Sequence, residues 1–318
     1  SSQAVSTVSN CVGFFAIVLS SLSADFERAL GPCPPNPPRP HEFLSDAAIN
    51  NDHSETSRRL DRRRWIARSG HSSPAQVNRS MFMDRLLANR RGVSLTPEER
   101  ARLEGAISEV RTFDPRLTII DAGKHIDVST FLLEGIMSRF LEDRKGLRQL
   151  VSIHIPGEFV DLHAYPMREL DHSIGTLTAV TVALVPHRAP KDILDPRPDL
   201  ARKLWFSTLI DAAMHRAWLF RVGRLDAVGR VAHFLCEMNA RLHAVGLSDG
   251  HRFVLALTQT DIAEICGLTT VHINRVLRQL REAGLCQMRA SLVEIEDREA
   301  LARRGNFSPD YLYLAPLP

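Results

Sequence analysis

Residues 257–285 decide the fold of this chain, and they read LTQTDIAEICGLTTVHINRVLRQLREAGL. Apolar residues recur at helical spacing on both sides of Gly267, which can take the positive φ of a tight turn at little cost. Thr258, with Asp261 three residues later, fits a capping box for the first helix, and Thr269 fits the cap of the second. The stretch therefore predicts two helices joined by a tight turn.

The second of these helices has an apolar side and a polar side. We expect Ile273, Leu277 and Leu280 to face inward, because residues three or four apart share one face of a helix. Gly284 is expected to end the helix. Polar side chains remain on the outward face: Thr270, His272, Asn274, Arg275 and Arg278. An ordinary helical pair with a solvated face would show the same two sides, so this pattern alone leaves both interpretations open.

The outward face suits DNA, and the residues that follow strengthen that interpretation. In a major groove, Arg275 could bind a guanine through two hydrogen bonds, and Asn274 could read an adenine. Several polar groups suit contacts with phosphates: Thr258, Gln259, Thr269, His272 and Arg278. Residues 285–297 read LCQMRASLVEIED and predict a hairpin that turns near residues 289–291. Two helices followed by such a wing favour a winged helix-turn-helix.

The composition fits ordinary globular domains. The 318 residues suffice for two domains, and a formal net charge of +3 means that affinity for nucleic acid must come from a local patch. The five cysteines are scattered without a CxxC pair, which argues against a disulfide framework, a cysteine-rich zinc site and an iron–sulfur cluster. We therefore expect a reducing, cytoplasmic compartment and no cofactor.

Residues 1–80 differ from the rest of the chain. The run GPCPPNPPRP at residues 31–40 is incompatible with a helix, and the basic run RRLDRRR at residues 58–64 lacks an apolar period. We expect a disordered extension, with the natural start near Met81, because all seven methionines lie at or after that residue. The apolar run at residues 11–22 is too short to span a bilayer and follows no basic residues, so we expect no membrane segment and no signal peptide.

The central part of the chain predicts a sheet domain followed by long helices. Residues 81–112 show a helical pattern, with Thr96 as a cap. Residues 117–186 consist of short runs of β-type residues separated by regularly spaced glycines, which predicts an antiparallel sandwich or barrel. Residues 198–224 predict a helix that is apolar on more than one face and needs two partners, one of them a second subunit. Asp226 is expected to cap a further helix.

Taken together, these motifs resemble the CRP/FNR family of bacterial regulators. Residues 257–285 resemble that family's helix-turn-helix, and LDAVGRVAHFLCEM at residues 225–238 resembles the helix that leads into its DNA-binding domain. Residues 131–163, FLLEGIMSRFLEDRKGLRQLVSIHIPGEFVDLH, are similar to its β-roll sensor with the glycine turns. The resemblance covers about residues 117–314 and omits residues 1–80.

The resemblance implies an α+β chain in which a sensor controls a DNA-binding domain. Its parts are expected to be a disordered extension at residues 1–80, an antiparallel, jelly-roll-like β-roll sensor with flanking helices at 81–197, a dimerisation helix at 198–224 and a winged helix-turn-helix domain at 225–318. It also implies a cytoplasmic homodimer on a pseudo-palindromic DNA site, in contact with RNA polymerase as an activator is, and no enzymatic activity.

Site residues follow from the same resemblance. The base contacts are expected at Thr270, Val271, Asn274 and Arg275, and a phosphate contact at Arg289 of the wing. Val271 departs from the family, in which many members have a glutamate that reads the operator. Arg275 matches the family's base-reading arginine.

The ligand side departs further from the family. Members that bind cyclic AMP have a Gly-Glu turn and then an Arg-Ser pair that holds the cyclic phosphate. Here Gly157 and Glu158 are present, but His172 and Ser173 stand at the Arg-Ser position. Histidine supplies a weaker, pH-dependent charge and no bidentate fork, so cyclic AMP is not the expected effector. These four residues remain candidates for a small-molecule effector of another kind, and a ligand-independent activator or repressor is the alternative.

Two other constellations allow alternative interpretations. Five potential metal ligands lie close together in the sequence: His154, Asp161, His163, Asp171 and His172. In a β-barrel they could bind a metal, which would make the chain a cupin-like metalloenzyme with an appended helical domain. Cys266 lies inside the helix-turn-helix, where oxidation could control DNA binding, or where it could simply be a buried small hydrophobe.

Overall fold

The computed structural model describes residues 79–187 and 198–315 of the chain. The disordered extension, the basic run and the apolar run expected within residues 1–78 therefore lie outside the described residues.

The N-terminal half of the described chain contains two antiparallel sheets, which form the β-roll. Its strands are β1 (Glu109–Phe113), β2 (Thr118–Ile120), β3 (Val128–Glu134), β4 (Met137–Glu142), β5 (Arg148–His154), β6 (Ser173–Thr176) and β7 (Val180–Pro186). The strand order is β1-β7-β3 in one sheet and β2-β6-β4-β5 in the other. A four-residue helix, α4 (Ala164–Met167), lies between β5 and β6.

Glycines form the expected turns between the strands. Gly135, between β3 and β4, has a φ of 88°, and a Cβ atom there would clash with the carbonyl oxygen of Ala179. Gly157, after β5, has a φ of 97°, and a Cβ atom there would lie 2.6 Å from the Cβ of Arg85. Only glycine fits either turn without strain, because both the backbone conformation and the space exclude a side chain.

The segment before the β-roll is only partly helical. It contains η2 (Arg79–Arg85), a 3-10 helix, and α3 (Pro97–Gly105), which Thr96 caps through a capping box with Glu99. The helical pattern expected to run to Thr112 is wrong at its end, because β1 begins at Glu109 and pairs antiparallel with β7. Backbone pairing across the sheet outweighs the local helical pattern there.

The C-terminal half begins with two long helices. They are α6 (Pro198–Arg224) and α7 (Ala227–Ala244), the second capped by Asp226 as expected. The remaining elements are β8 (Arg252–Val254), α8 (Gln259–Cys266), α9 (Thr270–Glu282), β9 (Cys286–Arg289), β10 (Leu292–Ile295), α10 (Arg298–Arg304) and η3 (Pro309–Leu312). These elements and the antiparallel sheets agree with the predicted α+β class.

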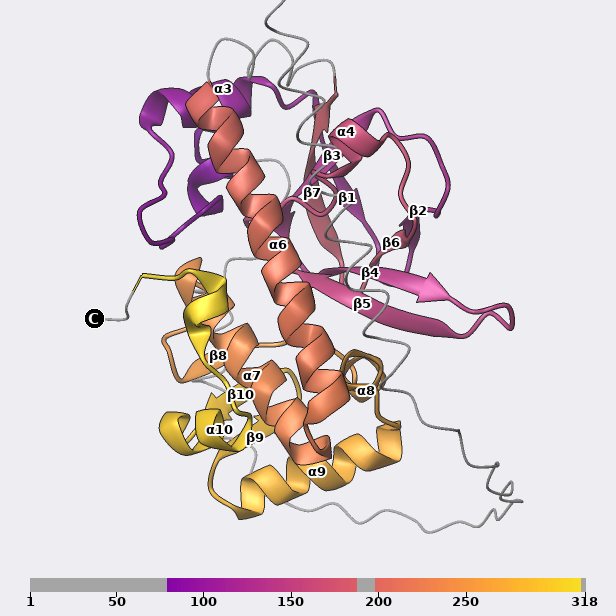
Figure 1. Cartoon of the computed structure of the whole chain (residues 1–318), viewed down its shortest axis with the longest axis vertical. Coiled ribbons are helices and arrows are strands. Elements are labelled where there is room, and N and C mark those ends of the chain that lie inside the picture. The colour runs from indigo at the N-terminus through magenta and orange to yellow at the C-terminus, as the bar shows by residue number, and fades with distance from the viewer. Residues whose placement is uncertain (1–78, 188–197, 316–318) are drawn as a thin grey trace, which may run out of the picture. The chain divides into compact units, whose positions relative to one another are not determined.

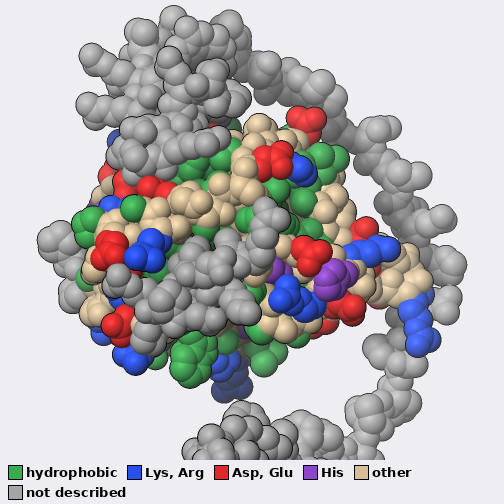
Figure 2. All heavy atoms as spheres, turned by 90° about the horizontal axis from the view of Figure 1, so that it is seen from above, with side chains coloured by type: hydrophobic (Ala, Val, Ile, Leu, Met, Phe, Trp, Pro, Cys, Tyr) green, Lys and Arg blue, Asp and Glu red, His purple; other side chains and the backbone are tan. Residues whose placement is uncertain are grey.

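The helix α6 links the β-roll to the C-terminal helices. In Figure 1 it runs past the sheets and ends beside α7, α8 and α9. One hydrophobic cluster contains Phe140 and Ile153 of the β-roll together with Phe234 and Leu235 of α7. Seen from the end where α3 lies, acidic and basic side chains of the described residues alternate over the surface (Figure 2). That end shows no uniformly basic area among the described residues.

Candidate functional site

The helix-turn-helix is built as its sequence predicts. The Thr258 side chain accepts a hydrogen bond from the Asp261 backbone N–H, and Asp261 accepts one in return from the Thr258 backbone N–H, which starts α8. Gly267 ends α8 with a φ of 62°, and the Thr269 side chain accepts a hydrogen bond from the His272 backbone N–H at the start of α9. These caps satisfy backbone groups that a helix end leaves free, and they fix the angle between α8 and α9.

One residue of the expected inward face of α9 differs. Ile273 and Leu280 are buried as predicted, but Val276 is the third buried residue and Leu277 is only half-buried. Both choices share the helical spacing, and the packing of α9 against α7 and α8 selects Val276.

The outward face of α9 is open to solvent. Every residue expected to contact bases or phosphates from this helix is exposed: Thr270, Val271, His272, Asn274, Arg275 and Arg278. Val271 leaves 75% of its surface exposed, which is unusual for a β-branched apolar side chain. Among the described residues, Arg275 has no ion-pair partner, so its guanidinium is free to bind an external group, whereas Arg278 lies 3.7 Å from Glu282.

The other expected phosphate contacts surround α9. Thr258, Gln259 and Thr269 are exposed at the N-termini of α8 and α9. Arg289 is exposed at the end of β9, where the β9–β10 hairpin turns through Ala290 with a φ of 53°. The hairpin expected as a wing is thus present and follows α9 directly. Two helices, a wing and exposed arginines form a surface that matches the major groove in its chemistry.

Burial decides the state of Cys266. The side chain is fully buried, and burial raises the pKa of its thiol to about 11. A thiol that is protonated and out of reach of solvent reacts slowly with oxidants. The position therefore supports the interpretation as a buried small hydrophobe.

A second surface runs along α6. Exposed residues recur there at alternating spacings of three and four: Arg202, Trp205, Leu209, Ala212, Arg216, Leu219 and Gly223. We call this set the α6 stripe. Trp205, Leu209 and Leu219 are among the most exposed large apolar residues of the described chain. A heptad of this kind is the pattern by which two helices pair in a coiled coil.

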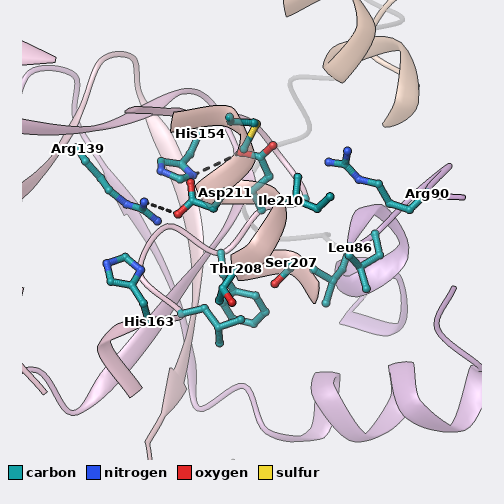
Figure 3. A pocket seen from close by; sticks show the side chains of 15 residues that line it. Leu86, Arg90, Arg139, His154, His163, Ser207, Thr208, Ile210 and Asp211 are labelled. Carbon is teal, nitrogen blue, oxygen red and sulfur yellow. Dashed lines mark hydrogen bonds and ion pairs between the residues drawn. The ribbon is translucent and has the colours of Figure 1, made fainter. Parts of the chain in front are cut away.

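A small cavity lies between the β-roll and the opposite side of α6 (Figure 3). Its volume is about 50 Å³, which leaves room for a few water molecules. Arg139 of β4 points toward Asp211 of α6, and its Nη1 donates to Asp211 Oδ2 at 2.5 Å. Arg139 also donates twice to the carbonyl oxygen of Val160, so most of its hydrogen-bonding capacity is already used.

The histidines of this cavity are held neutral. Burial and the charge of Arg139 lower the pKa of His154 to about 4 and that of His163 to about 3. Burial also raises the pKa of Asp161 to about 6, although the Thr130 backbone N–H donates to it. Among residues 79–187 and 198–315, no three histidine, cysteine, aspartate or glutamate side chains are placed to hold a metal ion.

The four candidate ligand residues divide into two pairs. Gly157 and Glu158 line the cavity, whereas His172 and Ser173 do not. His172 Nδ1 pairs with Asp171 at 2.7 Å, and Ser173 accepts a hydrogen bond from the Ala122 backbone N–H. The carboxylate of Glu158 is bound by Arg241 of α7. The sequence analysis did not identify Arg241 and Glu237 as partners of this site. Two opposite charges four residues apart in the apolar stretch of α7 could have indicated a buried ion pair.

No helix within the described ranges combines the length and the apolar character that crossing a bilayer requires.

Comparison with known proteins agrees with this arrangement. A family model for the Crp-like helix-turn-helix domain matches residues 229–304. The chain is similar to the "Anaerobic regulatory protein" of Haemophilus influenzae, at 21% identity over 208 residues, which are 65% of this chain and 80% of that protein. It is also similar to the "Fumarate and nitrate reduction regulatory protein" of Escherichia coli K12, at 21% identity over 210 residues, 66% of this chain and 84% of that protein.

Solved structures show the same fold. FixK2 from Bradyrhizobium japonicum superposes with a TM-score of 0.56 at 22% identity, covering 61% of this chain and 96% of that one. A CRP-family transcriptional regulator from Thermus thermophilus gives a TM-score of 0.50 at 16% identity, over 62% of this chain and 97% of that one.

Proposed function

We propose that this chain, which belongs to the CRP/FNR family of transcription regulators and carries a DNA-binding helix-turn-helix, binds a pseudo-palindromic DNA site as a homodimer. The matched relatives are regulators, so the chain is a regulator and not an enzyme, and the metalloenzyme alternative loses its support. From the family resemblance we further propose that it acts in the cytoplasm as an activator in contact with RNA polymerase.

The exposed face of α9 carries this proposal. Its cap fixes the helix N-terminus, its apolar side is buried against α7 and α8, and its polar side is free of the protein. We assign base contacts to Thr270, Val271, Asn274 and Arg275. Val271 offers only apolar contact, which suits the methyl group of a thymine, and Arg275 suits a guanine. The assigned phosphate contacts are Thr258, Gln259, Thr269, His272, Arg278 and Arg289.

The α6 stripe supports the dimer. Its opposite side is already covered, because Leu204 and Ile210 are buried against other parts of the chain. Large apolar residues such as Trp205 and Leu219 would remain in water in a monomer, and parallel pairing with a second copy would cover them. Each subunit of such a dimer would present one α9, and dimeric helix-turn-helix proteins read half-sites one helical turn apart.

Selection of bound DNA from a random pool, using the full chain, tests this function. The expected result is a symmetric consensus with half-site centres about 10 base pairs apart. Binding that falls steeply with salt and shows no consensus would contradict the proposal, because contacts with phosphates alone behave in that way.

A matched pair of variants separates base from phosphate contacts. Arg275→Ala is expected to cost about 1–3 kcal/mol on the consensus and to relax the preference at one base pair of each half-site. Arg289→Ala is expected to weaken binding to all sequences alike and to reduce the salt dependence. The same loss of preference in both variants would contradict the assignment.

A further inference from the structure

Four charges, three of them buried and the fourth, Glu158, partly buried, form a continuous row from the β-roll to the helix-turn-helix. In order they are Glu158 after β5, Arg241 and Glu237 on α7, and Arg221 on α6. Their signs alternate, and each charge lies against the next one. We call this set the charge row.

The first pair joins the β-roll to α7. Arg241 Nη2 donates to both oxygens of Glu158, at 3.0 and 2.8 Å, and to the carbonyl oxygen of Ile153 at 2.7 Å. The Arg241 side chain is 2% exposed and that of Glu158 is 16% exposed. The turn that carries Glu158 is itself fixed, because its carbonyl oxygen accepts a hydrogen bond from the Leu132 backbone N–H of β3.

The row continues to the end of α8. Arg241 Nη1 donates to Glu237 Oε1 at 3.2 Å, and Arg221 Nη1 lies 3.8 Å from Glu237 Oε2. Arg221 is fully buried, with its guanidinium over the Trp218 ring, and its Nη2 lies 3.5 Å from the carbonyl oxygen of Ile265. That carbonyl belongs to the last turn of α8, directly before the tight turn that leads to α9. A cation at a helix C-terminus is favourable because the helix dipole is negative there.

The partners keep Glu158 and Arg241 charged. Burial alone would raise the pKa of Glu158, but Arg241 and His154 lower it to about 2. Burial alone would lower the pKa of Arg241, but Glu158 and Glu237 raise it instead. A buried ion pair adds little stability compared with apolar residues of the same volume, but removing one partner leaves the other unpaired. The ion pair between Glu158 and Arg241 therefore acts mainly by fixing the β-roll and α7 in one position relative to each other.

We propose that Glu158 and Arg241 are positioning residues that hold the DNA-binding domain against the β-roll in an orientation competent for DNA, with the protein's own arginine in place of an effector. This proposal rests on the proposed DNA-binding function. The proposed contact explains how the DNA-binding domain is held in place. It also means that Glu158, which stands at the expected ligand position, binds an arginine of the same chain.

Further contacts support the same docked arrangement. Arg116, in the loop before β2, forms a bidentate ion pair with Asp261 of α8. Arg148 of β5 lies 3.1 Å from Glu264, and the Gln149 side chain donates to the Glu264 carbonyl oxygen at 2.6 Å. The β-roll thus contacts α8 at its surface as well as α7 in the interior. In this arrangement the outward face of α9 stays exposed.

The test compares Glu158→Gln with a matched control. Glu158→Gln keeps the shape and removes the charge that Arg241 faces. The control is Glu99→Gln, because Glu99 is 14% exposed and pairs with Lys203 at 2.6 Å, but this pair joins α3 to α6 and does not reach the DNA-binding domain. Binding to DNA selected by the wild type is measured at matched folded concentration. Cleavage by trypsin after the exposed Arg224, the last residue of α6, reports release of the domain without any DNA.

We expect Glu158→Gln to bind the selected DNA roughly 5- to 150-fold more weakly and to be cut faster after Arg224. Glu99→Gln should lower the stability of the fold but leave DNA binding and cleavage after Arg224 unchanged. Arg241→Met should give the same defect, and the double variant should be no worse than either single one. If Glu158→Gln fails to fold, Glu158→Asp, which keeps the charge on a shorter side chain, should show the faster cleavage. Unchanged or tighter DNA binding by a folded Glu158 variant, with unchanged cleavage, would overturn the proposal. Failure of the wild type to select any DNA would instead overturn the proposed function.

Discussion

The α6 stripe gives a prediction whose size follows from exposure. Leu219 leaves 75% of its surface in water in the single chain. Full burial of a leucine side chain contributes about 1.5–3 kcal/mol, and in the proposed dimer two copies of Leu219 would meet across the two-fold axis. Replacing it by alanine keeps the Cβ, so Leu219→Ala should cost the dimer about 2–4 kcal/mol. This corresponds to a dimer dissociation constant about 30- to 700-fold higher.

Sedimentation equilibrium over a range of protein concentrations measures that constant. Met167→Ala is the control, because Met167 is 59% exposed on α4 and lies outside the stripe. The variant dimer should also lose affinity for the selected DNA at protein concentrations below its new dissociation constant, since a single half-site binds weakly. A Leu219→Ala chain that dimerises as the wild type does, or a Met167→Ala chain with the same defect, would refute the assignment of the stripe.

Three further predictions concern stability. The pKa values of His154 and His163 in the folded protein lie below the ordinary value, so both histidines favour the folded state fully above about pH 6.5 and lose this effect as the pH falls toward 4. Urea unfolding from pH 8 to 4 should show this loss of unfolding free energy, and the loss should be less steep in His163→Gln. The pKa of Asp161 is raised instead, so its ionisation destabilises the fold as the pH rises from about 4 to 6. Asp161→Asn should therefore increase the free energy of unfolding by up to about 3 kcal/mol at pH 7 and leave it unchanged at pH 4. An equal increase at both pH values would refute this assignment. Arg116→Ala leaves the buried Asp261 without its cation and should destabilise the fold by about 1–3 kcal/mol, whereas an unchanged melting temperature would contradict that role.

The helix-turn-helix could be predicted from the sequence because its signals are local. The capping box at Thr258 needs only a partner three residues away, and the turn at Gly267 needs only a residue that accepts a positive φ. The exposed face of α9 followed from the helical period. The choice between Val276 and Leu277 as the inward residue did not follow from that period, since it depends on how α9 packs against α7 and α8.

Features that depend on distant partners were missed. Glu109–Phe113 forms β1 because β7, about 70 residues later, supplies its hydrogen bonds, and nothing local signals that pairing. The charge row joins Glu158 to Arg241, 83 residues apart, and no spacing in the sequence connects them. Glu237 and Arg241 did carry a local signal, as two charges four residues apart on an apolar stretch of α7, but the sequence analysis did not use it.

The contact between Glu158 and Arg241 also bears on whether the β-roll needs an effector. A ligand that used Glu158 would have to displace Arg241 and leave a buried guanidinium without one partner. Breaking a buried pair costs about 3–5 kcal/mol, so such a ligand would bind about 100- to 4000-fold more weakly than its own contacts allow. The cavity beside Glu158 has a volume of about 50 Å³, far too small to supply compensating contacts without rearrangement. Because the arginine already occupies the carboxylate, the arrangement favours a regulator whose output follows its abundance over one that waits for a small molecule.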